Sequence, residues 1–151
     1  MGADPSGGDG PGADPAGAGR PDTDELRADC TRCAGLCCTV LGFAASADFA
    51  EDKAPRTPCR HLRTDFRCRI HADLVERGYP GCTAYDCFGA GQLTTQVTFG
   101  GRTWRDAPET AAAVFDAFGV QRRLQELRWY LRQARALPAA APLHPDLDGA
   151  R

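Results

Sequence analysis

The chain has 151 residues, of which 42% are hydrophobic, and a net charge of −2 at pH 7. So small a net charge gives no reason to expect a nucleic-acid or membrane-surface partner. Because no run of ~18 or more apolar residues occurs, a transmembrane helix is excluded as well.

Residues 1–22 consist mostly of Gly, Ala, Pro, Asp and Ser. They contain neither the basic start nor the apolar stretch of a secretory signal, so we expect a cytoplasmic protein with reduced thiols. A segment this poor in large apolar side chains predicts a disordered tail over 1–22. The Pro- and Ala-rich stretch 138–151 predicts a second disordered tail. One domain is left over 23–137, with a cysteine-rich half, 23–90, and a helical half, 104–137.

All eight cysteines fall between residues 30 and 87. In a reducing compartment, clustered cysteines indicate metal ligands sooner than disulfides. Tetrahedral zinc takes four thiolates, and an iron-sulfur cluster also takes four protein ligands, so the expected cofactor is zinc or an iron-sulfur cluster. His61 and His71 are further possible nitrogen ligands. The candidate metal ligands are Cys30, Cys33, Cys37, Cys38, Cys59, Cys68, Cys82 and Cys87.

The first cysteines form one dense burst, and two local geometries are open for it. A helix beginning at Cys30 would place Cys30, Cys33 and Cys37 on one stripe, with Cys38 about a quarter turn away. Gly35 weakens such a helix by about 1 kcal/mol, which leaves a turn around it as the alternative. Both geometries bring the first three sulfur atoms together.

The later cysteines are expected at the ends of short elements. Residues 66–70 alternate as a strand does after the turn residues 64–65, which predicts a small hairpin that brings Cys59 near Cys68. The pattern over 71–78 predicts a helix capped by Gly78, and 79–81 a turn leading to Cys82. Four arginines crowd this stretch and either offset thiolate charge or line a solvated face. They are Arg60, Arg63, Arg67 and Arg69.

From residue 107 onward the pattern becomes helical. Residues 111–118 form one apolar stripe and residues 124–134 a second, with Gly119 between them. We therefore predict two helices that pack over the cysteine-rich half, with Pro108 in the first turn of one and Pro138 ending the other. The last helix is rich in arginine and carries two aromatic residues. We expect these helices to contact a protein partner rather than nucleic acid.

The cysteine order resembles a family of proteins described as zinc- or iron-chelating, whose pattern is CxxCxxxCC followed by single cysteines. His71 stands where that family usually has tyrosine. A closer resemblance, over about 29–137, is to the cysteine-rich leader of actinobacterial pentapeptide-repeat proteins, carried by residues 33–38, 43–50, 85–92 and 97–101. The resemblance implies a metal or iron-sulfur site on the first seven cysteines and, by extension, Cys87. Repeat units occur only singly here, so no repeat β-helix is expected.

The predicted fold class is mainly α with a small irregular or β-hairpin cysteine-rich half, in a metal-stabilised single domain with a disordered N-terminal tail. No catalytic triad, paired carboxylates or phosphate loop indicates an enzyme. The expected function is that of a metal-binding cysteine-cluster protein with a structural, interaction or regulatory role. The alternative is a thiol or iron-sulfur redox protein, which the adjacent Cys37 and Cys38 suggest.

Overall fold

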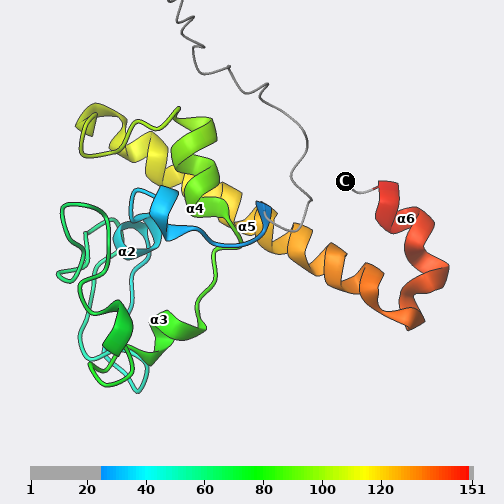
Figure 1. The fold of residues 1–151 in the computed structure, drawn as a ribbon, viewed down its shortest axis with the longest axis horizontal. Coiled ribbons are helices and arrows are strands. Elements are labelled where there is room, and N and C mark those ends of the chain that lie inside the picture. The colour runs from blue at the N-terminus through cyan, green and yellow to red at the C-terminus, as the bar shows by residue number, and fades with distance from the viewer. Residues whose placement is uncertain (1–24, 150–151) are drawn as a thin grey trace, which may run out of the picture.

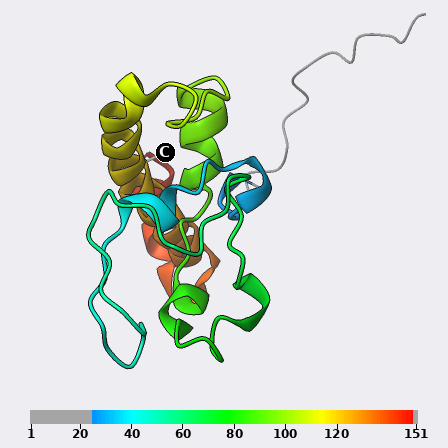
Figure 2. The same ribbon diagram turned by 90° about the vertical axis from the view of Figure 1, so that its left-hand side faces the viewer.

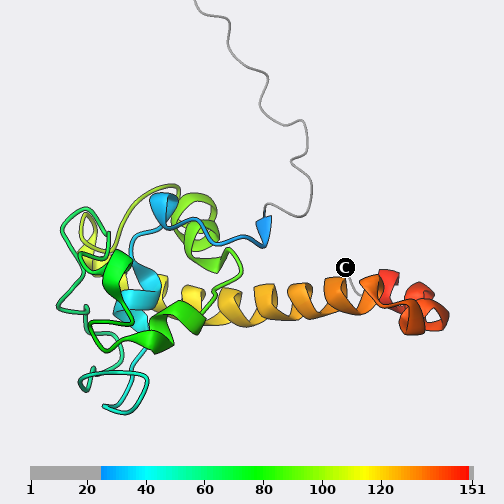
Figure 3. The same cartoon turned by 60° about the horizontal axis from the view of Figure 1, so that its bottom comes forward.

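The long helix α5 (Ala111–Ala136) organises residues 25–149, which are the residues that this computed structural model describes. The second half of α5 extends away from the body (Figures 1 and 3). The predicted mainly helical fold is confirmed, whereas the predicted tail over 1–22 lies outside the described residues. The first half of α5 packs against α2 (Leu36–Val40), α4 (Ala90–Gln92) and the π-helical η3 (Leu93–Thr98).

Gly119 lies inside α5, so the prediction of two separate helices was wrong. A Cβ added at Gly119 would meet no atom within 4 Å. Glycine weakens a helix interior by only about 1 kcal/mol relative to alanine, and the good helix formers on both sides outweigh this. The predicted helix ends are confirmed. Pro108 begins the 3₁₀ turn η4 (Pro108–Thr110) that leads into α5, and α5 ends before Pro138.

The second apolar stripe of α5 does not pack over the cysteine-rich half, which is a further correction. Leu124 and Leu127 are 54% and 57% exposed, and Val120 is exposed beside them. Three of the four residues that α5 buries, Val114, Phe115 and Phe118, belong to its first half, and the fourth, Gln125, donates from its side chain to the Phe88 carbonyl at 3.1 Å. The rest of the described chain covers only part of the length of α5 (Figure 3).

Residues 138–149 form η5 (Pro138–Leu143) and α6 (His144–Gly149), so the predicted C-terminal disorder was wrong for this segment. Pro138 stands in the first turn of η5, where a missing N–H leaves no hydrogen bond unmade. Both elements fold back against α5, and Arg135 forms an ion pair with Asp148. Contacts with the end of α5 therefore order this segment.

Two separate core clusters hold the described residues together. The first lies between α2, α4 and α5, and Cys33, Cys37 and Cys87 pack at its edge. The second lies in the irregular loops between α2 and α4 (Figure 2), and Cys68 packs at its edge. The first cluster consists of Ala34, Leu36, Ala90, Val114, Phe115 and Phe118. The second consists of Ile70, Leu74 and Tyr79, with Phe43 and Phe49 against them.

The cysteine-rich half settles the open local geometry in favour of a turn. A short 3₁₀ helix, η1 (Cys30–Arg32), is capped by Asp29, whose side chain accepts a hydrogen bond from the Thr31 N–H at 2.8 Å. Gly35 then adopts a left-handed conformation, with φ of 65°, and α2 begins after it. The three cysteines therefore do not share one continuous helix.

The segment after Cys68 departs from its prediction in two places. Only η2 (His71–Asp73) of the predicted helix is a regular 3₁₀ element, and α3 (Pro80–Ala84) occupies the predicted turn before Cys82. The cap at Gly78 agrees with the prediction. Its N–H donates to the Val75 carbonyl at 3.0 Å and the next N–H donates to the Leu74 carbonyl at 2.8 Å, which is a Schellman motif.

The predicted hairpin is reduced to an isolated bridge between Leu62 and Cys68, and residues 25–149 contain no sheet. Within the same residues, no helix combines the length and the apolar character that crossing a bilayer requires.

Candidate metal centre

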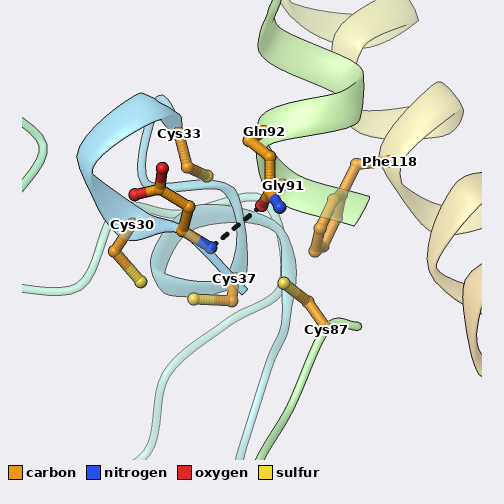
Figure 4. Close-up of a pocket in the computed structure, with 8 residues that line it drawn as sticks. Cys30, Cys33, Cys37, Cys87, Gly91, Gln92 and Phe118 are labelled. Carbon is orange, nitrogen blue, oxygen red and sulfur yellow. Dashed lines mark hydrogen bonds between the residues drawn. The ribbon is translucent and has the colours of Figure 1, made fainter. Parts of the chain in front are cut away.

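Four of the eight predicted ligands, which we call the inner group, line one small cavity beside the first core cluster. Two stretches that are well separated along the chain meet here, one through η1 and α2 and the other just before α4. Phe118 of α5, fully buried, closes the cavity on the helical side. The cavity has a volume of about 20 Å³. The inner group consists of Cys30, Cys33, Cys37 and Cys87 (Figure 4).

Gly91 allows α4 to approach the inner sulfur atoms. A Cβ at Gly91 would stand 2.6 Å from the Sγ of Cys33 and 3.8 Å from the Sγ of Cys87. The Asp29 N–H donates to the Gln92 side-chain oxygen at 3.1 Å and ties the start of η1 to α4 (Figure 4). The cavity therefore has a fixed wall on the α4 side.

Burial opposes ionisation of the inner thiols in the absence of a cation. It raises the pKa of Cys33 to about 11 and also raises the pKa of Cys30. The pKa of Cys37 rises well above its ordinary value, first because Cys37 donates a hydrogen bond to Cys38 and then because it is buried. Only the thiolate binds a metal. A cation entering this cavity would therefore displace protons.

Backbone N–H groups point at three of the sulfur atoms. At Cys33, Cys59 and Cys68 the N–H two residues further along donates to Sγ and opposes the rise in pKa that burial causes. At Cys59 the distance from the N–H nitrogen to Sγ is 3.5 Å. Such donors favour a negative sulfur and fix its direction, as the hydrogen bonds around metal ligands do.

The other four cysteines, the outer group, lie outside this cavity, with Cys38 on α2, Cys82 on α3, and Cys59 and Cys68 in the irregular loops between these helices. The Cys59 N–H donates to the Cys38 carbonyl at 2.9 Å, and the Cys82 N–H donates to the Tyr79 carbonyl at 3.1 Å. Burial, followed by the charges of the other three members, raises the pKa of Cys82 to about 11. These four thiols are therefore close enough to interact through their charges. The outer group consists of Cys38, Cys59, Cys68 and Cys82.

The adjacent Cys37 and Cys38 face different surroundings. Their Sγ atoms are 3.9 Å apart, and Cys37 lines the inner cavity whereas Cys38 does not. Consecutive side chains on a helix diverge by about 100°, which separates the two directions on α2. The hydrogen bond from Cys37, followed by the charge of Lys53, lowers the pKa of Cys38 to about 7. Cys38 therefore ionises before its neighbour.

Lys53 is a residue of this site that the motifs did not identify. It is only 8% exposed, and its Nζ donates to the carbonyl oxygens of Thr39 at 3.1 Å, Ala54 at 3.3 Å and Leu41. These bonds hold a cation beyond the C-terminal end of α2, beside the outer group. The signal in the sequence that could have identified Lys53 was composition, because it is the single lysine of a chain with seventeen arginines.

The four arginines divide between their two predicted roles. Arg60 and Arg63 form exposed ion pairs with nearby carboxylates, at 3.0 and 3.2 Å. Burial raises the pKa of Cys30 in the inner group, and the charge of Arg67 partly offsets this rise. Burial also raises the pKa of Cys68 in the outer group, and the charge of Arg69 partly offsets that rise. The prediction of a solvated face thus describes one pair, and the prediction of charge offset describes the other.

The predicted histidines stand apart from the inner cavity. The His61 Nε2 lies 3.2 Å from the Tyr79 hydroxyl, which donates to Glu51 at 2.6 Å. His71 lines a separate, shallow groove along η2. Nitrogen ligation by these two side chains stays a prediction.

The donor set fits a thiophilic metal in its chemistry, but its side chains do not form a closed site. Among residues 25–149, no three His, Cys, Asp or Glu side chains have the mutual spacing that holds a metal ion. The eight cysteines are all free thiols. Closing a site therefore requires cysteine side chains to rotate from one staggered position to another.

Comparison with known proteins finds a similar protein, and the similarity covers only part of it. The chain is 50% identical over 123 residues to the uncharacterized protein YybG of Bacillus subtilis (strain 168). The aligned part is 82% of this chain but 44% of that relative, so the chain spans less than half of its length. No protein-family model matches the chain, and no solved structure matches it. The resemblance to the cysteine-cluster family stays a prediction.

Proposed function

We propose that this chain is a metal-binding cysteine-cluster protein whose thiolates hold a metal ion that stabilises its cysteine-rich half. One observation carries the proposal: the four thiols of the inner group line one small cavity beside the main core. Neutral thiols gain little from such a convergence, whereas four thiolates are a complete ligand set for a tetrahedral metal. The N–H groups directed at sulfur support the same conclusion, because they stabilise negative charge.

We propose zinc as the ion in the inner cavity. A cavity of about 20 Å³ accepts roughly one water-sized sphere. That volume suits a single ion better than a cluster of several iron atoms with bridging sulfides. The small core of the cysteine-rich half supports a structural role, because a bound metal contributes directly to folding free energy in small domains.

The proposed role also includes contact with a protein partner through the C-terminal helices. Val120, Leu124 and Leu127 are exposed apolar side chains on α5. The metal would then hold the body against α5 while the projecting half of the helix is left available.

Elemental analysis of the full chain, purified without oxygen, tests the proposal. We expect stoichiometric zinc, and we expect a strong chelator to remove it together with the fixed tertiary structure of the cysteine-rich half, followed by near-UV circular dichroism. Protein that contains neither zinc nor iron and is still folded would refute metal binding.

A matched pair of variants separates ligand loss from general damage. Cys33→Ser removes a sulfur of the inner cavity, and we expect it to lower metal content. Arg32→Ser places the same side chain one position earlier, on an exposed residue, and should leave metal content unchanged. Equal loss in both variants would contradict a specific role for the Cys33 sulfur.

The alternative function is thiol or iron-sulfur redox chemistry, and the Cys37–Cys38 pair favours it. Their sulfur atoms are 3.9 Å apart and Cys38 ionises readily. Two thiols that lose two protons and two electrons to an oxidant would form a disulfide. Visible absorbance that bleaches on reduction would support an iron-sulfur centre, whereas colourless protein with stoichiometric zinc would exclude electron transfer by such a centre.

A further inference from the structure

We propose that the eight cysteines form two separate four-sulfur sites, the inner group and the outer group, and that each site binds one thiophilic divalent ion such as zinc. This inference rests on the proposed metal binding and extends it. It assigns a second site that lacks an enclosed cavity, and it states which cysteines belong to each ion.

The division starts at Cys37 and Cys38, where the chain passes from one group to the other. Cys37 lines the inner cavity together with Cys30, Cys33 and Cys87. Cys38 is directed elsewhere by the helical twist of α2, and its carbonyl accepts the Cys59 N–H at 2.9 Å. Although the two sulfur atoms are only 3.9 Å apart, just one of them lines the inner cavity, which leaves the other available to a second ion.

Backbone hydrogen bonds gather the remaining members of the outer group. The Leu62 N–H donates to the Cys59 carbonyl at 2.9 Å, and Leu62 forms the isolated bridge with Cys68. Cys68 packs against the cluster that contains Tyr79, whose carbonyl accepts the Cys82 N–H. Backbone contacts therefore link the four chain segments that carry the outer cysteines, although residues 38 and 82 are distant in sequence.

A buried cation also lies beside the outer group. Four thiolates and one divalent ion leave a site with two surplus negative charges, which nearby cations stabilise. The Lys53 Nζ donates to the carbonyl oxygens of Thr39, the residue after Cys38, and of Leu41.

The test compares two variants of the full chain, Cys87→Ser for the inner group and Cys82→Ser for the outer group. Metal content per chain is measured by elemental analysis, and Co²⁺ titration follows the visible bands of tetrahedral thiolate coordination. Eight thiolates at four per ion give an expected two ions for the native chain and one for each variant.

Alkylation mapped by mass spectrometry identifies which thiols each lost ion had protected. In Cys82→Ser we expect Cys38, Cys59 and Cys68 to react rapidly while the inner group stays protected. In Cys87→Ser we expect the reverse. If Cys87→Ser does not fold, Cys82→Ser decides alone, because it must keep one ion and a protected inner group.

Three results would overturn the division. A native chain with one ion per molecule would keep the proposed function but remove the second site. A Cys82→Ser variant that exposes the inner thiols would show one shared site. Several iron atoms with acid-labile sulfide would replace single ions by a cluster. A native chain without any metal would instead refute the proposed function itself.

Discussion

The inner and outer groups contain the same number of thiols but differ in what positions them. The inner group lies against α4 and the buried half of α5, with Phe118 and Gly91 forming parts of its wall. The outer group lies on α2, on the short helix α3 and in the loops between them, which are tied by single backbone hydrogen bonds and by a small aromatic cluster. Packing therefore determines the inner geometry, whereas the outer geometry depends more on what the thiols bind.

The largest expected difference between the groups is in how pH changes metal affinity. Metal binding releases the thiol protons, so metal affinity falls about tenfold per pH unit for each thiol that is protonated in the metal-free protein. With three protonated thiols, the fall is about a thousandfold per pH unit. Burial raises the pKa of Cys33 to about 11, so this thiol stays protonated between pH 7 and 8.5 in the metal-free protein, and metal binding releases one full proton from it. Cys38, whose pKa is lowered to about 7 by its bond to Cys37 and by Lys53, releases only part of one.

As pH falls, the outer site should therefore lose metal affinity less steeply than the inner site. The reason is that binding of its ion releases about one proton fewer above pH 7. Competition titrations with a chromophoric chelator measure this, with Cys82→Ser reporting the inner site and Cys87→Ser the outer site. A steeper slope for the outer site would show that Cys38 is not the more acidic member of its pair.

The second prediction concerns the packed wall of the inner site. Phe118→Ala removes a fully buried side chain at the cavity and should lower the free energy of unfolding by about 3–5 kcal/mol. Leu127→Ala, on the exposed side of the same helix, should change it by less than about 1 kcal/mol. Urea unfolding followed by circular dichroism compares them.

Metal content sharpens this second comparison. Phe118→Ala should weaken metal retention at the inner group while the outer group keeps its ion. Equal loss from both groups would indicate that α5 supports the loops as directly as it supports the cavity.

The third prediction concerns Lys53 and the outer group. Lys53→Met removes the buried charge beside Cys38 and should raise the pKa of that thiol. A rise of about one unit from a pKa of about 7 lowers the thiolate fraction at pH 7 about fivefold, which corresponds to about fivefold weaker metal binding. Competition titration should find the inner site unchanged, and Lys53→Arg, which keeps the charge, should lose less affinity. A loss of metal affinity at the inner site alone would contradict the prediction that Lys53 acts on the outer group.

The sequence was sufficient for the parts of this structure that depend on local chemistry. It predicted helical residues after 107, the helix ends near Pro108 and Pro138, and the cap at Gly78, because proline and glycine restrict the backbone directly. The gathering of the cysteines agrees with their clustering along the chain. Their division, by contrast, depends on contacts between loops that are distant in sequence.

The errors came from features that only tertiary contacts decide. Gly119 was expected to end a helix, although a cost of about 1 kcal/mol is small in a long helix. Residues 138–149 were expected to be disordered, although the end of α5 offers them a surface. Lys53 was passed over because a lone lysine in a loop gives no pattern, and only the surrounding carbonyl groups show its burial.

The smallest predicted effect tests whether α5 is one continuous support for the inner group. Gly119→Ala should raise the free energy of unfolding by about 0.5–1 kcal/mol, because alanine favours a helix interior and a Cβ there meets nothing within 4 Å. Gly91→Ala is the matched control, since its Cβ would stand 2.6 Å from the Cys33 Sγ and should disturb the inner group. Both variants are measured by urea unfolding and by metal content. If Gly119 were instead a joint between two helices, alanine would destabilise the protein, and the wall behind Phe118 would be less rigid than the comparison of the two groups requires.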